Sequence, residues 1–263
     1  MSIFGKVAYN ILPDRYFAAL RVLRDPRFSL AVEKVTYNQD RLLTSHNCDF
    51  MNDERFARAY KKGEETGSWE TVNVHWRAFV TCWAADRAKN LEGDFVECGV
   101  NLGGLSRTVM EYIDFASMKN KKFYLLDTYE GLSEKYVSDE ERKHGIGGAG
   151  SYAGGYVECY DTVKATFGIF ENSIIIKGTV PDTLSQVKAE KVCYLSIDMN
   201  CAEPEIAAAE FFWDKLVSGA AIILDDYGWT EHIVQKLAFD DFAKRKNVPL
   251  LPLPTGQGLI IKP

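Results

Sequence analysis

The chain has 263 residues, enough for one large α/β domain with additions or for two small domains. Its composition, 46% hydrophobic and 26% charged, is typical of a globular protein with a sizeable core. The net charge of −6 argues against proteins that bind nucleic acids or anionic membrane surfaces.

The cysteines and the N-terminal segment indicate the cellular setting. Six cysteines are spread along the chain without a CxxC pair or a zinc-binding spacing, so we expect reduced, packed thiols. Lys6, Asp14 and Arg15 interrupt the beginning of the chain, which has neither a signal-peptide core nor a membrane-spanning stretch. These features predict a soluble cytoplasmic protein.

Residues 1–90 are expected to form a helical extension. A basic amphipathic helix is expected near residues 14–24. Asn52 or Asp53 can cap a short helix that ends at Gly63. A longer helix is expected over about residues 69–90, where apolar side chains recur at helical spacing. Aromatic residues on these helices favour a homodimer or a larger homo-oligomer.

Residues 91–263 have the pattern of a doubly wound α/β domain. Five apolar runs alternate with helix-like stretches: "DFVECGV", "KFYLLDT", "SIIIKGT", "VCYLSIDM" and "AAIILDDY". Apolar runs without polar alternation are typical of strands buried on both faces, and their alternation with helices predicts a parallel sheet. The runs "PLLPLP" and "GLIIKP" can close the sheet as a hairpin with an antiparallel last strand.

Acidic residues end four of the five predicted strands. These residues are Glu97, Asp127, Asp198, and Asp225 with Asp226, whereas the remaining strand ends at Gly178. Ligands of such sheets bind outside the carboxyl ends of the strands. We therefore expect the functional site at this edge.

The first predicted turn, "ECGVNLGGLS", brings backbone N–H groups close to a ligand. Its spacing is GxxxGG and not GxGxxG, which weakens the case for a pyrophosphate. Glu97 favours a cationic group instead, such as an ammonium or a sulfonium. The alternative is a glycine turn with no ligand.

The other acids suggest a ribose site and a metal site. Asp127 can accept two hydrogen bonds from a ribose, or cap the turn that follows it. Asp198, Asp225 and Asp226 gather at one edge if their strands are neighbours, and crowded carboxylates favour a hard divalent cation such as Mg²⁺. Alternatively, Asp225 caps the next helix and Asp226 faces solvent.

Four motifs in this order resemble the macrocin O-methyltransferase (TylF-type) family: "GDFVECGVNLGGLSRTVM", "FYLLDTYEGL", "YLSIDMN" and "AIILDDYG". The resemblance covers about residues 90–263. It implies a Rossmann-like sheet of the class I methyltransferase type and S-adenosylmethionine as the cofactor. It also implies metal-assisted methylation of a hydroxyl, on a sugar or glycosylated metabolite.

The resemblance also assigns roles to residues. The methionine part of the cofactor would meet Glu97, Cys98, Gly99, Asn101, Gly103 and Ser106. Asp127 and Thr128 would meet the ribose, Gly178 and Thr179 would lie near the adenine, and Asp198 would also border the cofactor. Asp198, Asp225 and Asp226 match the family's metal ligands.

One departure from the family concerns the catalytic base. The family usually has Asp-Gly-Asp where this chain has Asp198-Met199-Asn200, and the second Asp is the proposed base. Asn200 cannot accept a proton at neutral pH. Either the metal alone acidifies the hydroxyl, or another residue is the base, or the acceptor differs. His232 is a candidate base, or else a surface or capping histidine.

The segment "KHGIGGAGSYAGGY" has six glycines between positions 145 and 155. It predicts either a mobile lid within residues 133–160 or a disordered surface loop. Two other functions remain open: a nucleotide-cofactor oxidoreductase, and a cofactor-binding protein that has lost catalysis.

Overall fold

The computed structural model describes residues 34–69, 72–148 and 157–263, so the helix expected near residues 14–24 lies outside the described part. The described residues form two compact units. One contains residues 34–38 and 43–48, and the other contains residues 39–42 and 49–263. Strands β1 (Tyr37–Gln39) and β2 (Leu42–Thr44) pair as a two-stranded sheet.

A seven-stranded sheet lies at the centre of the second unit, in the order β5-β4-β3-β6-β7-β9-β8. Its strands are β3 (Asp94–Cys98), β4 (Phe123–Asp127), β5 (Ser173–Lys177), β6 (Val192–Ile197), β7 (Leu216–Leu224), β8 (Leu251–Pro252) and β9 (Gly258–Ile261). Strands β3 to β7 are parallel, and β9 runs antiparallel to β7 and β8. The predicted doubly wound sheet and its antiparallel hairpin are therefore confirmed.

The register of the sheet places the functional loops at one edge. Cys98 of β3 is level with Ile197 of β6, which is level with Leu224 of β7. The residues that follow these positions therefore leave the sheet side by side. Because β6 and β7 are neighbours, Asp198 and Asp225 emerge from adjacent strands, as the metal-site prediction required.

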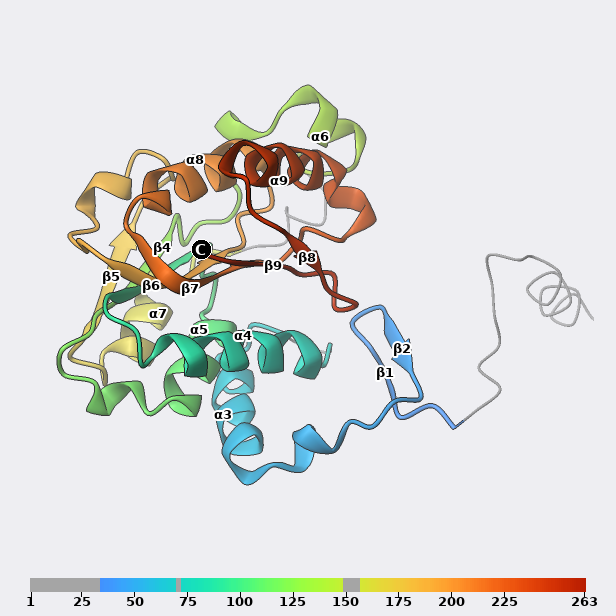
Figure 1. Cartoon of the computed structure of the whole chain (residues 1–263), viewed down its shortest axis with the longest axis vertical. Coiled ribbons are helices and arrows are strands. Elements are labelled where there is room, and N and C mark those ends of the chain that lie inside the picture. Colours follow the sequence, from blue (N-terminus) through green and yellow to red (C-terminus); the bar gives the residue numbers. More distant parts are fainter. Residues whose placement is uncertain (1–33, 70–71, 149–156) are drawn as a thin grey trace, which may run out of the picture. The chain divides into compact units, whose positions relative to one another are not determined.

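Helices cover both faces of the sheet (Figure 1). Helices α3 (Glu54–Glu64), α4 (His75–Ala88), α5 (Gly104–Tyr112) and α7 (Tyr160–Phe167) pack on one face, together with Phe95 and Tyr194. Helices α8 (Ala202–Trp213) and α9 (Ile233–Lys246) pack on the other, together with Val96 and Leu195. The alternation of side chains along each strand gives the sheet its two hydrophobic layers.

Short helical elements complete the part of the chain that the structure describes. They are α6 (Asp139–Lys143) and the 3-10 helices η1 (Asp49–Asn52), η2 (Phe115–Ser117), η3 (Glu134–Tyr136), η5 (Leu184–Gln186) and η6 (Thr230–His232). All six cysteines are buried and free, which confirms the expectation of packed thiols. Among the described residues, no helix has the length and apolar character needed to cross a membrane.

Two helices in the N-terminal third test the sequence patterns. Asp53 caps α3 by accepting a hydrogen bond from the Phe56 N–H at 2.9 Å, as expected. The second helix starts at His75 and not near Trp69. Gly67 adopts a φ of +80°, and the Trp69 ring stacks on Tyr60 with centroids 4.8 Å apart. The predicted helix began too early because Trp69, which packs on Tyr60 ahead of the helix, continues the helical spacing of the aromatic residues.

Candidate active site

A pocket lies along the carboxyl ends of the central strands. Its lining includes eight residues that the sequence assigned to the site: Gly99, Asn101, Asp127, Thr128, Gly178, Thr179, Asp198 and Asn200. The other assigned residues do not line this pocket: Glu97, Cys98, Gly103, Ser106, Asp225, Asp226 and His232. The structure therefore brings the turns after β3, β4, β5 and β6 together around one cavity.

Gly99 allows the turn after β3 to pass directly against the turn after β6. Its φ is +89°, and a Cβ atom at this position would come within 1.7 Å of the Asp198 carbonyl oxygen. The Asp198 N–H also donates to the Cys98 carbonyl at 2.8 Å. Only glycine fits this conformation and this contact, so Gly99 sets how closely the turn after β3 approaches Asp198.

Gly99→Ala is expected to destabilise the protein by about 2–5 kcal/mol, because it adds left-handed strain and a backbone clash. Gly145→Ala is the matched control, since its φ is +87° but nothing lies within 4 Å of the added Cβ. Urea unfolding of both variants measures the difference. Equal losses of stability in the two variants would show that the contact with Asp198 contributes nothing.

Asp127 connects two turns as well as bordering the pocket. Its Oδ2 accepts hydrogen bonds from the N–H groups of Val100 at 2.6 Å and Asn101 at 2.8 Å. Its Oδ1 accepts from the Tyr129 N–H at 2.6 Å, the local cap that the sequence allowed. The sequence did not indicate the link to the turn after β3. These two hydrogen bonds fix the position of the turn after β3 beside the pocket.

Glu97 is turned away from the pocket toward α5. It is buried and accepts a hydrogen bond from the Ser106 hydroxyl. Burial raises the pKa of Glu97 to about 8, so the carboxyl is mostly protonated near neutral pH. Cys98 points to the opposite face of the sheet and packs with the α8–α9 core. Neither side chain contacts the pocket directly.

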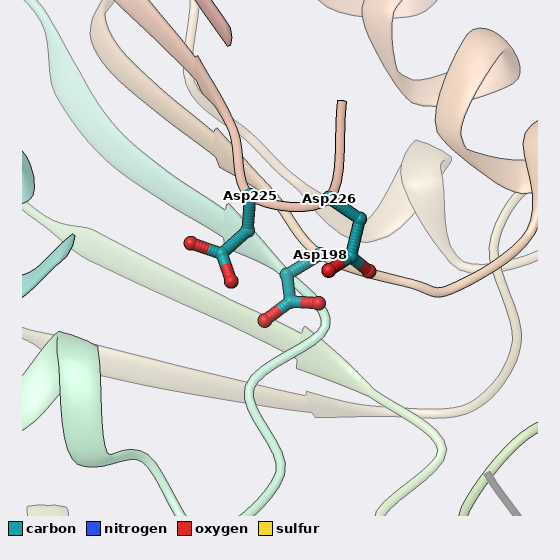
Figure 2. Close-up of side chains that lie close together, drawn as sticks. All are labelled: Asp198, Asp225 and Asp226. Carbon is teal, nitrogen blue, oxygen red and sulfur yellow. The ribbon is translucent and has the colours of Figure 1, made fainter. Parts of the chain in front are cut away.

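Three carboxylates meet beside the pocket. Figure 2 shows Asp198, Asp225 and Asp226 extending from adjacent loops toward one another. One oxygen of each lies within 4.8 Å of the others. Burial and the two neighbouring carboxylates raise the pKa of Asp198 well above its usual value, and burial raises the pKa of Asp226 to about 6. Such crowding is relieved when a cation is bound.

The alternative roles of Asp225 and Asp226 are not found. The Asp225 side chain is only 2% exposed, and it accepts hydrogen bonds from Arg77 at 2.6 Å and Gln257 at 2.9 Å. The Asp226 side chain is 11% exposed. Asp225 therefore does not cap α9, and Asp226 does not face solvent.

The donor set fits a hard divalent ion. Asp198, Asp225 and Asp226 bring three carboxyl groups together, and Arg77 pairs with Asp225 and also with Asp40, which lies outside this group. The Oδ2 atom of Asp226 is buried and accepts no hydrogen bond from the described residues. Oxygen ligands in excess of the local positive charge are what Mg²⁺ and similar ions require.

Asn200 is held in a tight turn at the pocket wall. Its φ is +61°, a left-handed conformation that asparagine tolerates better than most residues. The preceding Met199 N–H donates to Glu205 Oε1 at 2.8 Å, and that atom also accepts from Gln235 Nε2 at 2.9 Å. Burial raises the pKa of Glu205 to about 8. This buried pair fixes the backbone beside Asn200.

His232 belongs to the same network. It is 6% exposed, its Nδ1 hydrogen-bonds Gln235 Oε1, and the same nitrogen lies 3.8 Å from Asp226 Oδ2. It is therefore not a surface histidine, and its side chain makes no helix-capping hydrogen bond. The hydrogen bonds run from His232 through Gln235 to Glu205, and Asp226 lies next to the His232 end.

Sequence reasoning missed Arg77, Asp40, Gln257, Glu205 and Gln235. The partners of Arg77 are 37 and 148 residues away in the chain, so no local pattern connects them. Gln257 lies in "TGQG", which gave only a turn signal. Glu205 follows "MNCAEP" closely, and an acid there could have suggested a contact with the preceding loop. Asp40 and Gln235 had no sequence signal that pointed to the site.

The candidate lid is only partly described. Ser138 and Glu141 form a capping box on α6, and Glu141 Oε1 accepts the Ala202 N–H of α8 at 2.7 Å. Tyr160 begins α7 and packs against Tyr129, with ring centroids 5.6 Å apart. Two further tyrosines of this segment, at positions 152 and 156, lie outside the described residues. Whether this segment closes over the pocket stays a prediction.

The sequence matches a known protein family over most of its length. The model of the family described as "Macrocin-O-methyltransferase (TylF)" matches residues 71–253. A search of curated protein sequences found no significant match.

Solved structures show the same fold. The O-methyltransferase NovP has a TM-score of 0.59 and 18% identity, with 71% of this chain and 79% of that chain covered. CalS11, a calicheamicin methyltransferase, has a TM-score of 0.54 and 16% identity, with 87% and 98% covered. The Podospora anserina methyltransferase PaMTH1, bound to SAH, has a TM-score of 0.50 and 13% identity, with 80% and 88% covered.

Proposed function

Because this chain belongs to the macrocin-O-methyltransferase (TylF) family and is an S-adenosylmethionine-dependent O-methyltransferase, we propose that it methylates a sugar hydroxyl with the help of a divalent metal. The observation that carries the proposal is the position of the carboxylate cluster. Asp198 belongs both to the cluster and to the pocket lining, so a metal-held hydroxyl and the cofactor would share one cavity.

The pocket residues account for cofactor binding. Asp127 would accept hydrogen bonds from the ribose hydroxyls while it holds the turn at Val100 and Asn101 in place. Gly178 and Thr179, after β5, would border the adenine. Gly99 brings the turn after β3 directly against Asp198, and this turn would border the methionine part. Positioning of the two reactants is the main source of rate in such a displacement.

Asp198, Asp225 and Asp226 would hold the metal. A divalent ion held there would lower the pKa of the acceptor hydroxyl and orient it. The protein's own part is to keep three carboxylates in place: Arg77 and Gln257 hold Asp225, and the loop contact at Gly99 holds Asp198.

Methyl transfer replaces an O–H bond by an O–C bond, so a proton must leave the acceptor. Asn200 lines the pocket and can hydrogen-bond the hydroxyl, but its amide does not take the proton. His232 is enclosed by Gln235 and Asp226 and does not line the pocket. We therefore propose that the S–CH3 bond breaks as the O–C bond forms, and that the proton passes to solvent water without a side-chain base at position 200. General-base help is worth about 10²–10⁴-fold, so a slow enzyme is expected.

Ligand-dependent thermal stability tests this proposal. S-adenosylhomocysteine should raise the melting temperature of the full chain, whereas NAD(P) should not, because the ribose and turn geometry suit a cofactor without a pyrophosphate. Labelled S-adenosylmethionine with sugar acceptors should then give methylated product that EDTA suppresses and Mg²⁺ restores. Stabilisation by NAD(P) alone would contradict the cofactor assignment, and turnover unaffected by EDTA would contradict the metal role.

A further inference from the structure

Arg77 is shared between the carboxylate cluster and a separate chain segment. Its Nε and Nη2 donate to the two oxygens of Asp40 at 2.6 and 2.9 Å, and its Nη1 donates to Asp225 Oδ2 at 2.6 Å. The side chains of Arg77, Asp40 and Asp225 are 17%, 8% and 2% exposed. One buried guanidinium therefore neutralises part of the charge on both carboxylates.

Asp40 lies in the turn at residues 39–42, which a second arginine also fastens. Asp40 and Arg41 have φ values of 52° and 56°, the left-handed pair of a tight hairpin turn. Arg41 Nη1 donates to Glu231 Oε1 and Oε2 at 2.7 and 2.8 Å, and its guanidinium lies 4.7 Å from the Trp229 ring centre. Two arginines thus tie this turn to the segment that follows β7.

A metal ion at Asp225 would change how Arg77 divides its interactions. Arg77 stays charged at all relevant pH values, because Asp225 and Asp40 raise its pKa. A divalent ion and the guanidinium repel each other and draw on the same carboxylate. Asp40 is the other partner of Arg77, and its two-oxygen pairing with the guanidinium is the stronger geometry. Metal binding would therefore strengthen the Arg77–Asp40 pair.

We infer that Arg77 couples the divalent-metal site to the turn at residues 39–42, serving as the counter-ion of Asp225 without metal and as the anchor of Asp40 with metal. The inference rests on the proposed metal site. Coupling of this kind is reciprocal: if the metal tightens the docking of the turn, the docked turn tightens metal binding by the same factor. Arg77 is a positioning residue in this scheme, because it acts through Asp225.

Two substitutions should change metal affinity in opposite directions. Arg77→Met removes the competing cation, so we expect Mg²⁺ to bind about tenfold more tightly. Asp40→Asn removes the other carboxylate partner of Arg77, so the guanidinium pairs with Asp225 only and competes more strongly with the metal. We therefore expect Mg²⁺ to bind about tenfold more weakly. Isothermal titration of the full chain with Mg²⁺ measures both. If Arg77 only orients Asp225, both variants should weaken binding, and that result would overturn the inference.

Cleavage by trypsin after Arg41 reports on the turn itself. In the wild type, Mg²⁺ should slow cleavage of the 41–42 bond several-fold, because the turn is held more tightly. In Arg77→Met, saturating Mg²⁺ should leave the cleavage rate unchanged although the metal binds. The double variant Arg77→Met/Asp40→Asn keeps the net charge of the cluster, and it should show no Mg²⁺ effect on cleavage. This double variant provides the test of coupling if either single variant fails to fold. A full Mg²⁺ effect in the double variant would contradict the coupling.

Arg55→Met is the matched control. Arg55 pairs with Asp86 and the Tyr112 carbonyl, and Asp86 lies nine residues beyond Arg77 on α4, about 13 Å along the helix. This variant should leave both Mg²⁺ affinity and cleavage at Arg41 as in the wild type. Absence of Mg²⁺ binding to the wild type would refute the proposed metal role and this inference together. If the wild type binds Mg²⁺ and both single variants bind it more weakly, the inference is refuted and the proposed metal role stands.

Discussion

Replacing Asp198 by Asn is expected to slow metal-dependent methyl transfer strongly while making the metal-free protein more stable near neutral pH. The loss of turnover should be on the order of 10³-fold, because a metal ligand beside the reacting groups is removed. The stability gain follows from crowding: burial, Asp225 and Asp226 raise the pKa of Asp198, so its carboxyl destabilises the folded state above the unfolded pKa. Asn has the same shape without the charge.

The size of this gain in stability depends on pH. Below about pH 4 both the folded and the unfolded states bind the proton, so wild type and Asp198→Asn should be equally stable. The difference should grow as the pH rises above that value. Urea unfolding in EDTA at acidic and neutral pH measures it. A variant that is less stable than the wild type at neutral pH would show that the cluster is not strained by charge.

Asp225→Asn provides a contrast within the same cluster. Asp225 already has Arg77 and Gln257 as partners, so the substitution weakens a buried ion pair and should destabilise the protein. Both variants should lose Mg²⁺ affinity. We expect the two variants to change stability in opposite directions while both weaken Mg²⁺ binding. This result would show that each carboxylate binds the metal whatever its effect on the stability of the metal-free protein.

Replacing Asp127 by Ala is expected to weaken S-adenosylhomocysteine binding at least about 100-fold, because hydrogen bonds to a carboxylate are worth about 1.5–3 kcal/mol each. The substitution also leaves the N–H groups of Val100, Asn101 and Tyr129 without their acceptor. The turn after β3 should therefore lose its position as well. Calorimetric titration measures the affinity, and circular dichroism shows whether the fold persists.

Asp94→Ala is the control for this variant. Asp94 also accepts a backbone N–H hydrogen bond across the sheet, from Lys122 at 2.8 Å, but it lies at the first residue of β3. The control should cost some stability and leave cofactor affinity unchanged. If the two variants lose affinity equally, general loosening of the sheet explains the effect and the ribose role of Asp127 is wrong.

The sheet could be predicted because its signals are local. Five apolar runs gave the five parallel strands, and the turn between "PLLPLP" and "GLIIKP" gave the antiparallel hairpin. The start of the second N-terminal helix could not be predicted, because the Trp69 ring packs on Tyr60 through a contact between separate segments. Helical spacing of aromatic residues does not distinguish a helix from a packed loop beside one.

The candidate site divides in the same way. Asp198, Asp225 and Asp226 were predicted from their positions at strand ends, because parallel strands bring their carboxyl ends to one edge. The orientation of Glu97 was not, because alternation along β3 and the hydroxyl of Ser106 direct its carboxyl into the protein and away from the pocket. Position in a strand predicts the edge, and packing decides the direction.

By itself, the sequence determined the doubly wound sheet and the acidic residues at its edge, and its four motifs carried the resemblance that implied the methyltransferase type. Only the tertiary structure decided how those charges are balanced. Arg77, Gln257 and the Glu205–Gln235–His232 network come from helices and turns far away in the chain. Ion pairs and hydrogen bonds depend on the distance between groups in space, and a local sequence pattern does not reveal that distance.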